Sequence, residues 1–196
     1  MLWNASAIKG YAIEATDGHV GHVDDFLFSD ADWSVRSVVV AAGSWLGTHA
    51  VRLPAAVLGA PDVVRRLAPV RLTMAEVEAY ADPGAKADPL LRGLREITGY
   101  PVHAADGDIG HVTDLLVDDE GWGIRYLVIE TGHWWAGDKV LLVPGAVRAL
   151  DSEQRRVCVD VTRQQIEASP AYDPNATVDR GYEEALHGYY GWSAYF

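Results

Sequence analysis

The sequence predicts a mainly β protein that consists of two tandem small β-barrels with short capping helices, followed by a C-terminal helical tail. Three features of the 196-residue chain lead to this fold class. They are a long internal repeat, a hairpin turn followed by β-branched runs in each copy, and a helix-capping motif near the end of each copy. Hydrophobic residues make up 49% of the chain and charged residues 22%, a composition that is sufficient for a globular core.

The internal repeat has an offset of 89 residues, which is the separation of Gly10 and Gly99. Aligned without a gap, residues 8–53 and 97–142 are identical at 19 of 46 positions. A solenoid is built from shorter and more numerous units, so two copies of this length indicate duplicated domains.

A segment rich in proline, glycine and aspartate, Asp82–Pro89, follows the first copy. Residues of these types favour turns and irregular chain, which places a domain boundary there. We therefore expect one barrel module over residues 1–85 and a second, which carries the tail, over residues 86–196.

Each copy begins with a hairpin signal. Tyr11–Ala15 is expected to form a short strand, and the dipeptide Asp17-Gly18 supplies the turn because both residue types tolerate positive φ. The chain is expected to return as a strand over Val20–Phe28. The β-branched run Val35–Ala41 and its counterpart Ile124–Glu130 favour strands that are buried on both faces or closed into a barrel.

Each copy ends with a short strand and a helix start. The strands are expected at Pro69–Leu72 and Val157–Val161. The helix starts are the capping boxes Thr73–Glu76 and Thr162–Gln165, in which the threonine and the Glu or Gln side chain bind amide groups that lack a partner within the helix.

The tail that follows the second copy has no counterpart in the first. Val178–His187 has the periodicity of an amphipathic helix, with an end expected at Gly188 or Gly191. We expect this helix to pack back on the barrels. Docking of the tail onto a partner is the alternative.

The net charge of −12, from 16 basic and 28 acidic side chains, argues against nucleic acid as a partner. Nucleic-acid affinity depends on Lys and Arg side chains that displace counterions from phosphates. The sequence has no signal-peptide pattern and no apolar run long enough to span a membrane, so a cytoplasmic location is expected. The single cysteine, Cys158, lies in an apolar alternation and is expected to be a strand residue without a redox role.

Several segments of the second copy carry a family resemblance. They are Ile97–Val102, Asp106–Val112, Asp114–Asp119 and Trp122–Ile129, together with the tail from Ser169 to Glu184. These segments resemble the PRC-barrel family, whose known settings include the cytoplasmic domain of the photosynthetic reaction centre H subunit and the C-terminal domain of the ribosome maturation factor. The resemblance implies a small barrel and a role in protein–protein contact, and it implies no catalytic residues.

Two histidines, His22 and His111, recur at equivalent positions with acidic residues close by in the sequence. These residue types suit a metal site or an acid–base pair. Duplication alone also makes residues recur, so strand histidines bonded to the backbone or to a carboxylate are the favoured interpretation. The acidic turns at residues 30–32 and 118–120 lack the spacing of a calcium loop, and aspartate favours turns. We expect no catalytic residue, metal or cofactor.

Aromatic residues in loops and in the tail are the candidates for contact with a partner. Exposed aromatic side chains often anchor interfaces. The candidate residues are Trp45, Trp134, Trp135, Tyr189 and Tyr190.

The leading functional hypothesis is a non-enzymatic interaction or assembly module that binds a protein partner or forms a homodimer. A small-ligand or metal-binding sensor that uses His22 and His111 is one alternative. A peripheral assembly or electron-transfer-associated factor of a complex like the photosynthetic reaction centre is another, and it rests on family analogy alone.

Overall fold

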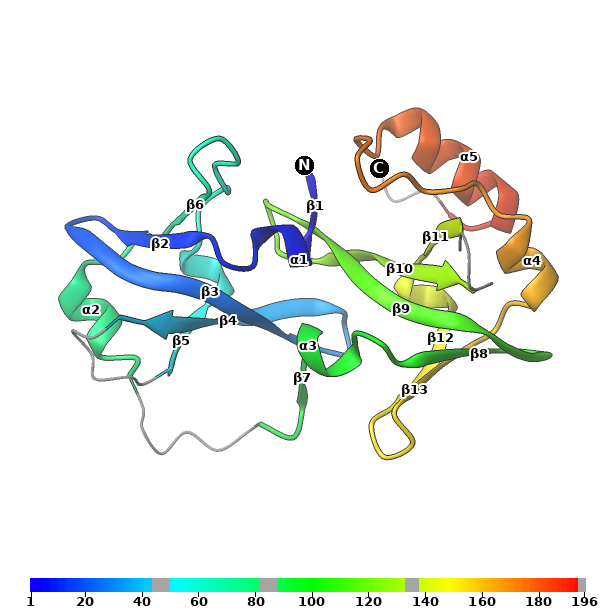
Figure 1. Cartoon of the computed structure of the whole chain (residues 1–196), viewed down its shortest axis with the longest axis horizontal. Coiled ribbons are helices and arrows are strands. Elements are labelled where there is room, and N and C mark those ends of the chain that lie inside the picture. The colour runs from blue at the N-terminus through cyan, green and yellow to red at the C-terminus, as the bar shows by residue number, and fades with distance from the viewer. Residues whose placement is uncertain (44–49, 82–87, 133–137, 194–196) are drawn as a thin grey trace. The chain divides into compact units, whose positions relative to one another are not determined.

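A computed structural model describes residues 1–43, 50–81, 88–132 and 138–193, which form two compact units. Unit 1 comprises Met1, Trp3–Glu96 and Val117–Ile124, and unit 2 comprises Leu2, Ile97–Leu116 and Arg125–Phe196. Both units are mainly β, as the sequence predicts, and each is built around one sheet (Figure 1). The module boundary between residues 85 and 86 stays a prediction.

Unit 1 contains a six-stranded sheet. Its strands are β2 (Ala12–Ala15), β3 (Gly18–Ser29), β4 (Ser34–Ala42), β5 (Ala50–Pro54), β6 (Leu67–Pro69) and β7 (Leu91–Gly93). They follow the order β5-β4-β3-β2-β6, and β7 pairs with β3. The β2–β6 pair is parallel and the other pairs are antiparallel. Among the described residues these pairings do not close the sheet into a barrel.

The long strand β3 pairs with β2, β4 and β7 along its length. Its register with β4 shifts between Val23 and Asp25 and again between Leu27 and Phe28. Such shifts bend a strand and increase its twist. The first shift also explains why the buried positions move from Val23 to Phe26, a spacing of three instead of the usual two.

Unit 2 contains a seven-stranded sheet with a similar arrangement. Its strands are β8 (Pro101–Ala104), β9 (Gly107–Asp118), β10 (Ile124–Thr131), β11 (Asp138–Leu142), β12 (Val147–Asp151) and β13 (Arg156–Val159), with β1 (Leu2–Asn4) paired to β9. The order is β11-β10-β9-β8-β13-β12. The β8–β13 pair is parallel, like its counterpart β2–β6.

The helices are short apart from the last one. Those that the structure describes are α1 (Ala5–Ile8), α2 (Met74–Glu78), α3 (Leu94–Ile97), α4 (Arg163–Glu167) and α5 (Arg180–Tyr190), together with the 3-10 turns η2 (Ala55–Val57) and η3 (Pro144–Ala146). Within the described ranges, no helix combines the length and apolar character needed to cross a membrane.

Both predicted capping boxes are present. Thr73 caps α2 and Thr162 caps α4, each with the reciprocal pair of hydrogen bonds. Each helix has a second side-chain acceptor at its N-terminus. The N–H of Arg163 in α4 donates to Oδ1 of Asp106 at 2.8 Å, and the N–H of Met74 in α2 donates to Oδ1 of Asp17 at 2.7 Å. The aspartate of the hairpin turn therefore also fixes the first turn of the helix.

The loops that precede β6 and β13 share one geometry. Arg66 and Arg155 end these loops with φ of 51°. Their guanidinium carbons lie 5.3 and 5.7 Å from the ring centres of Tyr11 and Tyr100. The attraction between a cation and an aromatic face partly offsets the cost of a left-handed backbone at a residue other than glycine. Equivalent residues of the repeat thus make equivalent contacts.

Unit 1 also takes up the hairpin segment Val117–Ile124, which comes from the second copy. The N–H of Val35 donates to the carbonyl of Trp122 at 2.9 Å, and the N–H of Ile124 donates to the carbonyl of Trp33 at 2.7 Å. Trp33 and Trp122 are equivalent in the repeat, and both have positive φ, at 54° and 57°. The two hairpin turns therefore hold each other through a matched pair of backbone hydrogen bonds.

Two expectations for the strands need correction. The strand expected at Pro69–Leu72 is observed at Leu67–Pro69. It starts earlier because the preceding loop is tight, with the N–H of Leu67 donating to the carbonyl of Asp62 at 2.9 Å. The sequence prediction also lacks β1, β7 and β12, since β1 and β7 are too short to show an alternating pattern and β12 carries exposed residues on both sides.

Candidate interaction site

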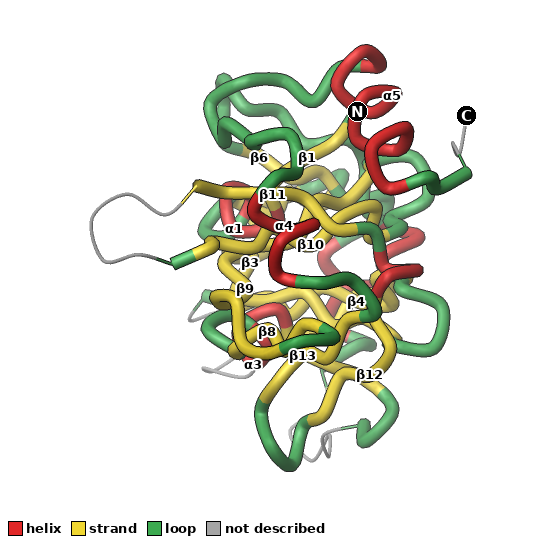
Figure 2. Tube along the Cα trace, turned by 90° about the vertical axis from the view of Figure 1, so that its right-hand side faces the viewer, coloured by secondary structure: helices red, strands yellow, loops and turns green. Residues whose placement is uncertain are grey.

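Helix α5 carries the two tail tyrosines that the sequence singles out. It begins after Asp179, whose Oδ1 accepts the N–H of Tyr182 at 2.8 Å. It ends at Gly191, which adopts the left-handed conformation with φ of 69°. The prediction of a tail helix is confirmed, and the later of the two candidate glycines ends it. Figure 2 shows α5 at the β11 end of the sheet of unit 2, with the β12–β13 hairpin at the opposite end.

One face of α5 packs against the outer face of β10 and β11. Tyr126 and Val128 alternate along β10, and Val128 lies opposite Leu141 of β11. Leu186 of the helix is fully buried in this cluster. Val143, Ala146, Tyr172 and Leu116 complete the cluster, and Leu2, Val178, Tyr182, Tyr190 and Trp192 pack around it. Burial of each large apolar side chain stabilises the docked tail by about 1.5–3 kcal/mol.

A polar network lies within this apolar contact. The hydroxyl of Tyr126 donates to Oε1 of Glu183 at 2.8 Å and lies 3.0 Å from Nε2 of His187. Nδ1 of the same histidine is 3.0 Å from the carbonyl oxygen of Ser193. His187 is only 4% exposed. The histidine therefore links the sheet, the helix and the chain that follows the helix.

The tyrosines of this region are held in the phenol form. Burial and the neighbouring Glu183 carboxylate raise the pKa of Tyr126. Burial raises the pKa of Tyr182 to about 12, and it also raises the pKa of Tyr190. These hydroxyls remain protonated at neutral pH, so they serve as hydrogen-bond donors, as Tyr182 does toward the carbonyl of Pro170 at 3.0 Å.

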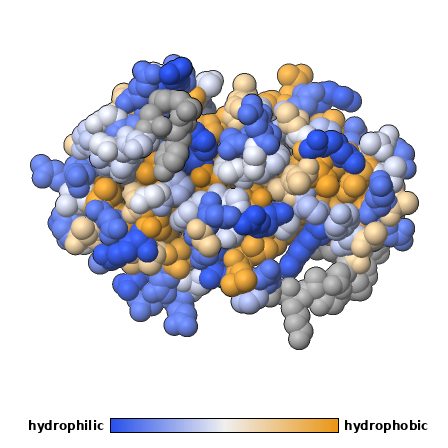
Figure 3. All heavy atoms as spheres, turned by 180° about the vertical axis from the view of Figure 1, so that it is seen from behind, coloured by the Kyte–Doolittle hydropathy of each residue, from blue (hydrophilic) through white to orange (hydrophobic). Residues whose placement is uncertain are grey.

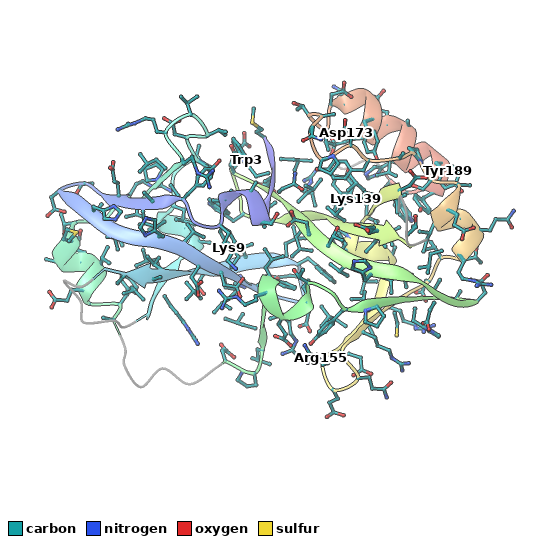
Figure 4. The ribbon with its side chains drawn as sticks, in the orientation of Figure 1. Trp3, Lys9, Lys139, Arg155, Asp173 and Tyr189 are labelled. Atoms are coloured by element: carbon teal, nitrogen blue, oxygen red, sulfur yellow. The ribbon has the colours of Figure 1, made fainter. Side chains whose placement is uncertain are left out.

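Three aromatic side chains gather at the C-terminal end of α5: Tyr189, Tyr190 and Trp192, which we call the aromatic patch. The rings of Tyr190 and Trp192 stack with centroids 3.9 Å apart. The hydroxyls of Tyr189 and Tyr190 donate to the carbonyl of Gln165 in α4, at 2.8 and 3.4 Å. Tyr189 is 42% exposed, and Figure 4 shows it at the end of α5 that adjoins α4. The patch is thus held in one arrangement before any partner binds.

The other predicted contact residues, Trp45, Trp134 and Trp135, lie outside the described residues. Tyr189 and Tyr190 are therefore the members of the predicted set whose surroundings the structure describes.

The two recurring histidines lie on the long strands. His22 is exposed on β3, in edge-to-face contact with His19 at 5.4 Å. His111 is half-buried on β9, opposite Pro101 of β8. In the part of the chain that the structure describes, no three His, Cys, Asp or Glu side chains come together as metal ligands.

The acidic turns are occupied by local hydrogen bonds. Oδ1 of Asp118 accepts the N–H of Gly121 at 2.6 Å. Asp32 accepts the hydroxyl of Ser34 at 2.8 Å and pairs with Arg36, and these contacts lower its pKa. Both aspartates thus have the turn-forming role that their residue type favours.

Unit 1 contains an open groove of about 660 Å³. Its lining includes Arg36 and Arg71 together with Asp119. Arg36 is paired with Asp32, and Arg71 donates to the carbonyl of Ala56 at 2.8 Å, so both arginines hold loops of the unit. On the face shown in Figure 3, hydrophobic side chains lie in small groups among hydrophilic ones.

Three residues that build the tail contact are not among the site residues predicted from the sequence: Tyr126, Glu183 and His187. Two signals were available. Glu183 and His187 are four residues apart, which places them on one face of a helix. Tyr126 stands where the first copy has Ser37, a change from a small polar to a large aromatic side chain at an equivalent strand position.

Comparison with known proteins adds one finding to this geometry. A search of curated proteins gives no match to the chain. A scan against protein-family models gives a match over residues 91–166, a span that runs from β7 to α4 and stops before α5. Residues 91–166 are a PRC-barrel domain.

Proposed function

We propose that this protein is a non-enzymatic interaction or assembly module in the cytoplasm, built from two tandem PRC-type barrels, and that it binds a protein partner or a second copy of itself. The observation that carries this proposal is the aromatic patch, which α5 presents beside the PRC-barrel domain. The proposed contact residues are Tyr189, Tyr190 and Trp192.

The chemistry of the patch suits a protein surface. Tyrosine and tryptophan are enriched among the residues that dominate binding energy, because they offer large apolar area together with a polar tip. The stacking of Tyr190 on Trp192 and the hydrogen bond from Tyr189 to Gln165 restrict these side chains in advance. Less conformational entropy is then lost on binding. The net charge of −12 favours a partner with a basic rim over nucleic acid.

The buried groups near the patch support a structural role for the tail contact. The hydroxyl of Tyr126 on β10 is bonded to Glu183 and to His187, which both belong to α5. Tyr126 and His187 are shielded from solvent, so a substrate would have to displace the helix to reach them.

Site-specific photo-crosslinking in the native host tests the proposal. A benzophenone amino acid at position 189 is expected to give a discrete cross-linked species, identified by mass spectrometry as a protein partner or a second copy. The matched control is position 80, because Tyr80 is 40% exposed and Tyr189 is 42% exposed. Equal cross-linking at both positions, or none at 189, would contradict the assignment of the patch.

A further inference from the structure

Tyr126 on β10 and His187 on α5 are buried and Glu183 on α5 is partly buried, and among the described residues their network has fewer hydrogens than its geometry requires. His187 lies between two oxygen atoms, the carbonyl oxygen of Ser193 at 3.0 Å and the hydroxyl oxygen of Tyr126 at 3.0 Å. A carbonyl oxygen can only accept a hydrogen bond, so Nδ1 of His187 must carry a hydrogen. In a neutral imidazole, Nε2 is then left as an acceptor.

Tyr126 cannot satisfy both of its neighbours under that condition. Its hydroxyl has a single hydrogen, and two acceptors would compete for it: Oε1 of Glu183 at 2.8 Å and Nε2 of His187 at 3.0 Å. The acceptor that does not receive this hydrogen then faces a lone pair of the phenol oxygen at hydrogen-bond distance. An unsatisfied polar contact between such shielded groups is unfavourable. Loss of the phenol proton gives no remedy, because burial and Glu183 raise the pKa of Tyr126.

One additional proton completes the network. With Nε2 protonated, His187 donates to Tyr126, Tyr126 donates to Glu183, and Nδ1 still donates to Ser193. The positive imidazolium and the negative carboxylate then flank one phenol, an arrangement of charge-assisted hydrogen bonds. We propose that docking of the C-terminal helix takes up one proton, held by His187 as an imidazolium, so that the tail docks more firmly as the pH falls from 8 to 6.

Within the described part of the chain, the charged and titratable groups around His187 come from each element that packs on it. Glu183 and Tyr190 lie on its own helix, and Tyr126 lies on β10 with Arg125 beside it. Lys139 shares a side of β11 with Leu141 of the cluster, by strand alternation. Trp192, which follows the helix, contacts the ring edge to face at 6.2 Å. The carboxylate of Glu183 favours the imidazolium, while Arg125 and Lys139 oppose it.

The sign of the pH effect follows from proton counting. The docked state binds more protons than the undocked state wherever the imidazole of the undocked tail is neutral. The equilibrium constant for docking of the tail then rises as the pH falls. For one proton, this rise is at most tenfold per pH unit. The effect is expected between about pH 8 and pH 6, where an ordinary imidazole titrates.

Hydrogen exchange of the α5 amides in the full-length protein, read by mass spectrometry after correction for intrinsic exchange, measures docking. In the wild type, protection of α5 is expected to rise as the pH is lowered from 8 to 6. His187→Gln is expected to remove most of this dependence. The matched control is His103→Gln, because His103 also pairs with a carboxylate in unit 2, that of Asp108 at 2.7 Å, but lies outside the α5 cluster. This control is expected to keep the wild-type slope.

Glu183→Gln distinguishes proton linkage from mere loss of packing. A neutral His187 then accepts from Tyr126, and the glutamine amide donates to the phenol oxygen, so no extra proton is needed. The slope is expected to vanish while protection at pH 8 equals or exceeds that of the wild type. The proposal is overturned if wild-type protection is independent of pH, or if His187→Gln keeps the full slope. It is also overturned if the NMR signals of the ring nitrogens show a neutral His187 imidazole in the docked protein at pH 6.

Discussion

At the residue scale, the glycines next to the recurring histidines account for part of the repeat. Gly21 and Gly110 directly precede His22 and His111 and have φ of 157° and 158°. A Cβ atom on Gly110 would lie 2.0 Å from the carbonyl oxygen of Glu130, and the corresponding distance at Gly21 is 2.1 Å. Two backbones therefore approach too closely for any side chain. Recurrence of this stretch follows from packing and requires no shared chemistry at the histidines.

Gly110→Ala tests this explanation. The added methyl group would collide with the backbone of β10, so the free energy of unfolding is expected to fall by about 3 kcal/mol. Urea unfolding followed by circular dichroism measures the loss. Gly145→Ala is the matched control, because its Cβ would meet no atom closer than 4.0 Å, and a change within about 0.5 kcal/mol is expected. A tolerated alanine at position 110 would contradict the packing argument.

At the scale of elements, the hairpin at the start of the second copy and the helix near its end depend on one aspartate. Asp106 forms the turn between β8 and β9, and it also accepts the N–H of Arg163 in α4 at 2.8 Å. Helices of this length have little stability of their own and rely on caps and tertiary contacts. The position of α4 matters for the aromatic patch, because the carbonyl of Gln165 accepts from Tyr189.

Asp106→Ala is expected to lower the free energy of unfolding by about 1 kcal/mol, the usual cost of removing a cap from a helix N-terminus. Asp106→Asn keeps an acceptor oxygen and should recover most of the loss. Asp108→Ala on the same hairpin removes an exposed pair with His103, and its effect should stay within about 0.5 kcal/mol. Thermal unfolding monitored by circular dichroism gives all three values, and equal effects of the two alanine variants would refute the capping role.

At the scale of the whole molecule, the two copies differ most clearly on one sheet face. The face that α5 covers in unit 2 includes Tyr126 and Leu141, both nearly inaccessible to solvent. The equivalent positions in unit 1 are Ser37 and Arg52, and both are only partly buried. Small polar and charged residues suit a face in contact with water, so the sequence difference matches the presence of the tail on unit 2.

Exchange of these residues between the copies tests that account. Leu141→Arg would place a charge under α5, and either the tail detaches or the protein loses about 3 kcal/mol or more of stability. Arg52→Leu, the reciprocal change in unit 1, should leave stability within about 1 kcal/mol of the wild type. Limited proteolysis of the tail, together with urea unfolding, reports both outcomes. A tail equally resistant to protease in Leu141→Arg would show that this face does not hold it.

The part of this architecture that could be predicted from the sequence is the local part. The Thr162 cap depends on neighbouring residues and appears as expected. The hairpin predicted near Asp17-Gly18 is also present, but its turn lies one residue earlier, at Thr16 and Asp17, and Gly18 is the first residue of β3. The network between Tyr126 and His187 joins residues 61 positions apart, and no local pattern encodes it. Register shifts such as the one after Val23 are set by pairing partners rather than by composition, which is why strand bounds and sheet closure were the weaker predictions.

The matched hydrogen bonds between the hairpin turns have an evolutionary consequence. The N–H of Val35 donates to the carbonyl of Trp122, a residue that belongs to the other copy of the repeat. A descendant gene that lost either copy would leave those backbone groups to solvent and expose apolar surface around them. The repeat thus resists deletion even while its halves diverge, which leaves each half free to acquire a different exterior as long as the shared turns are kept.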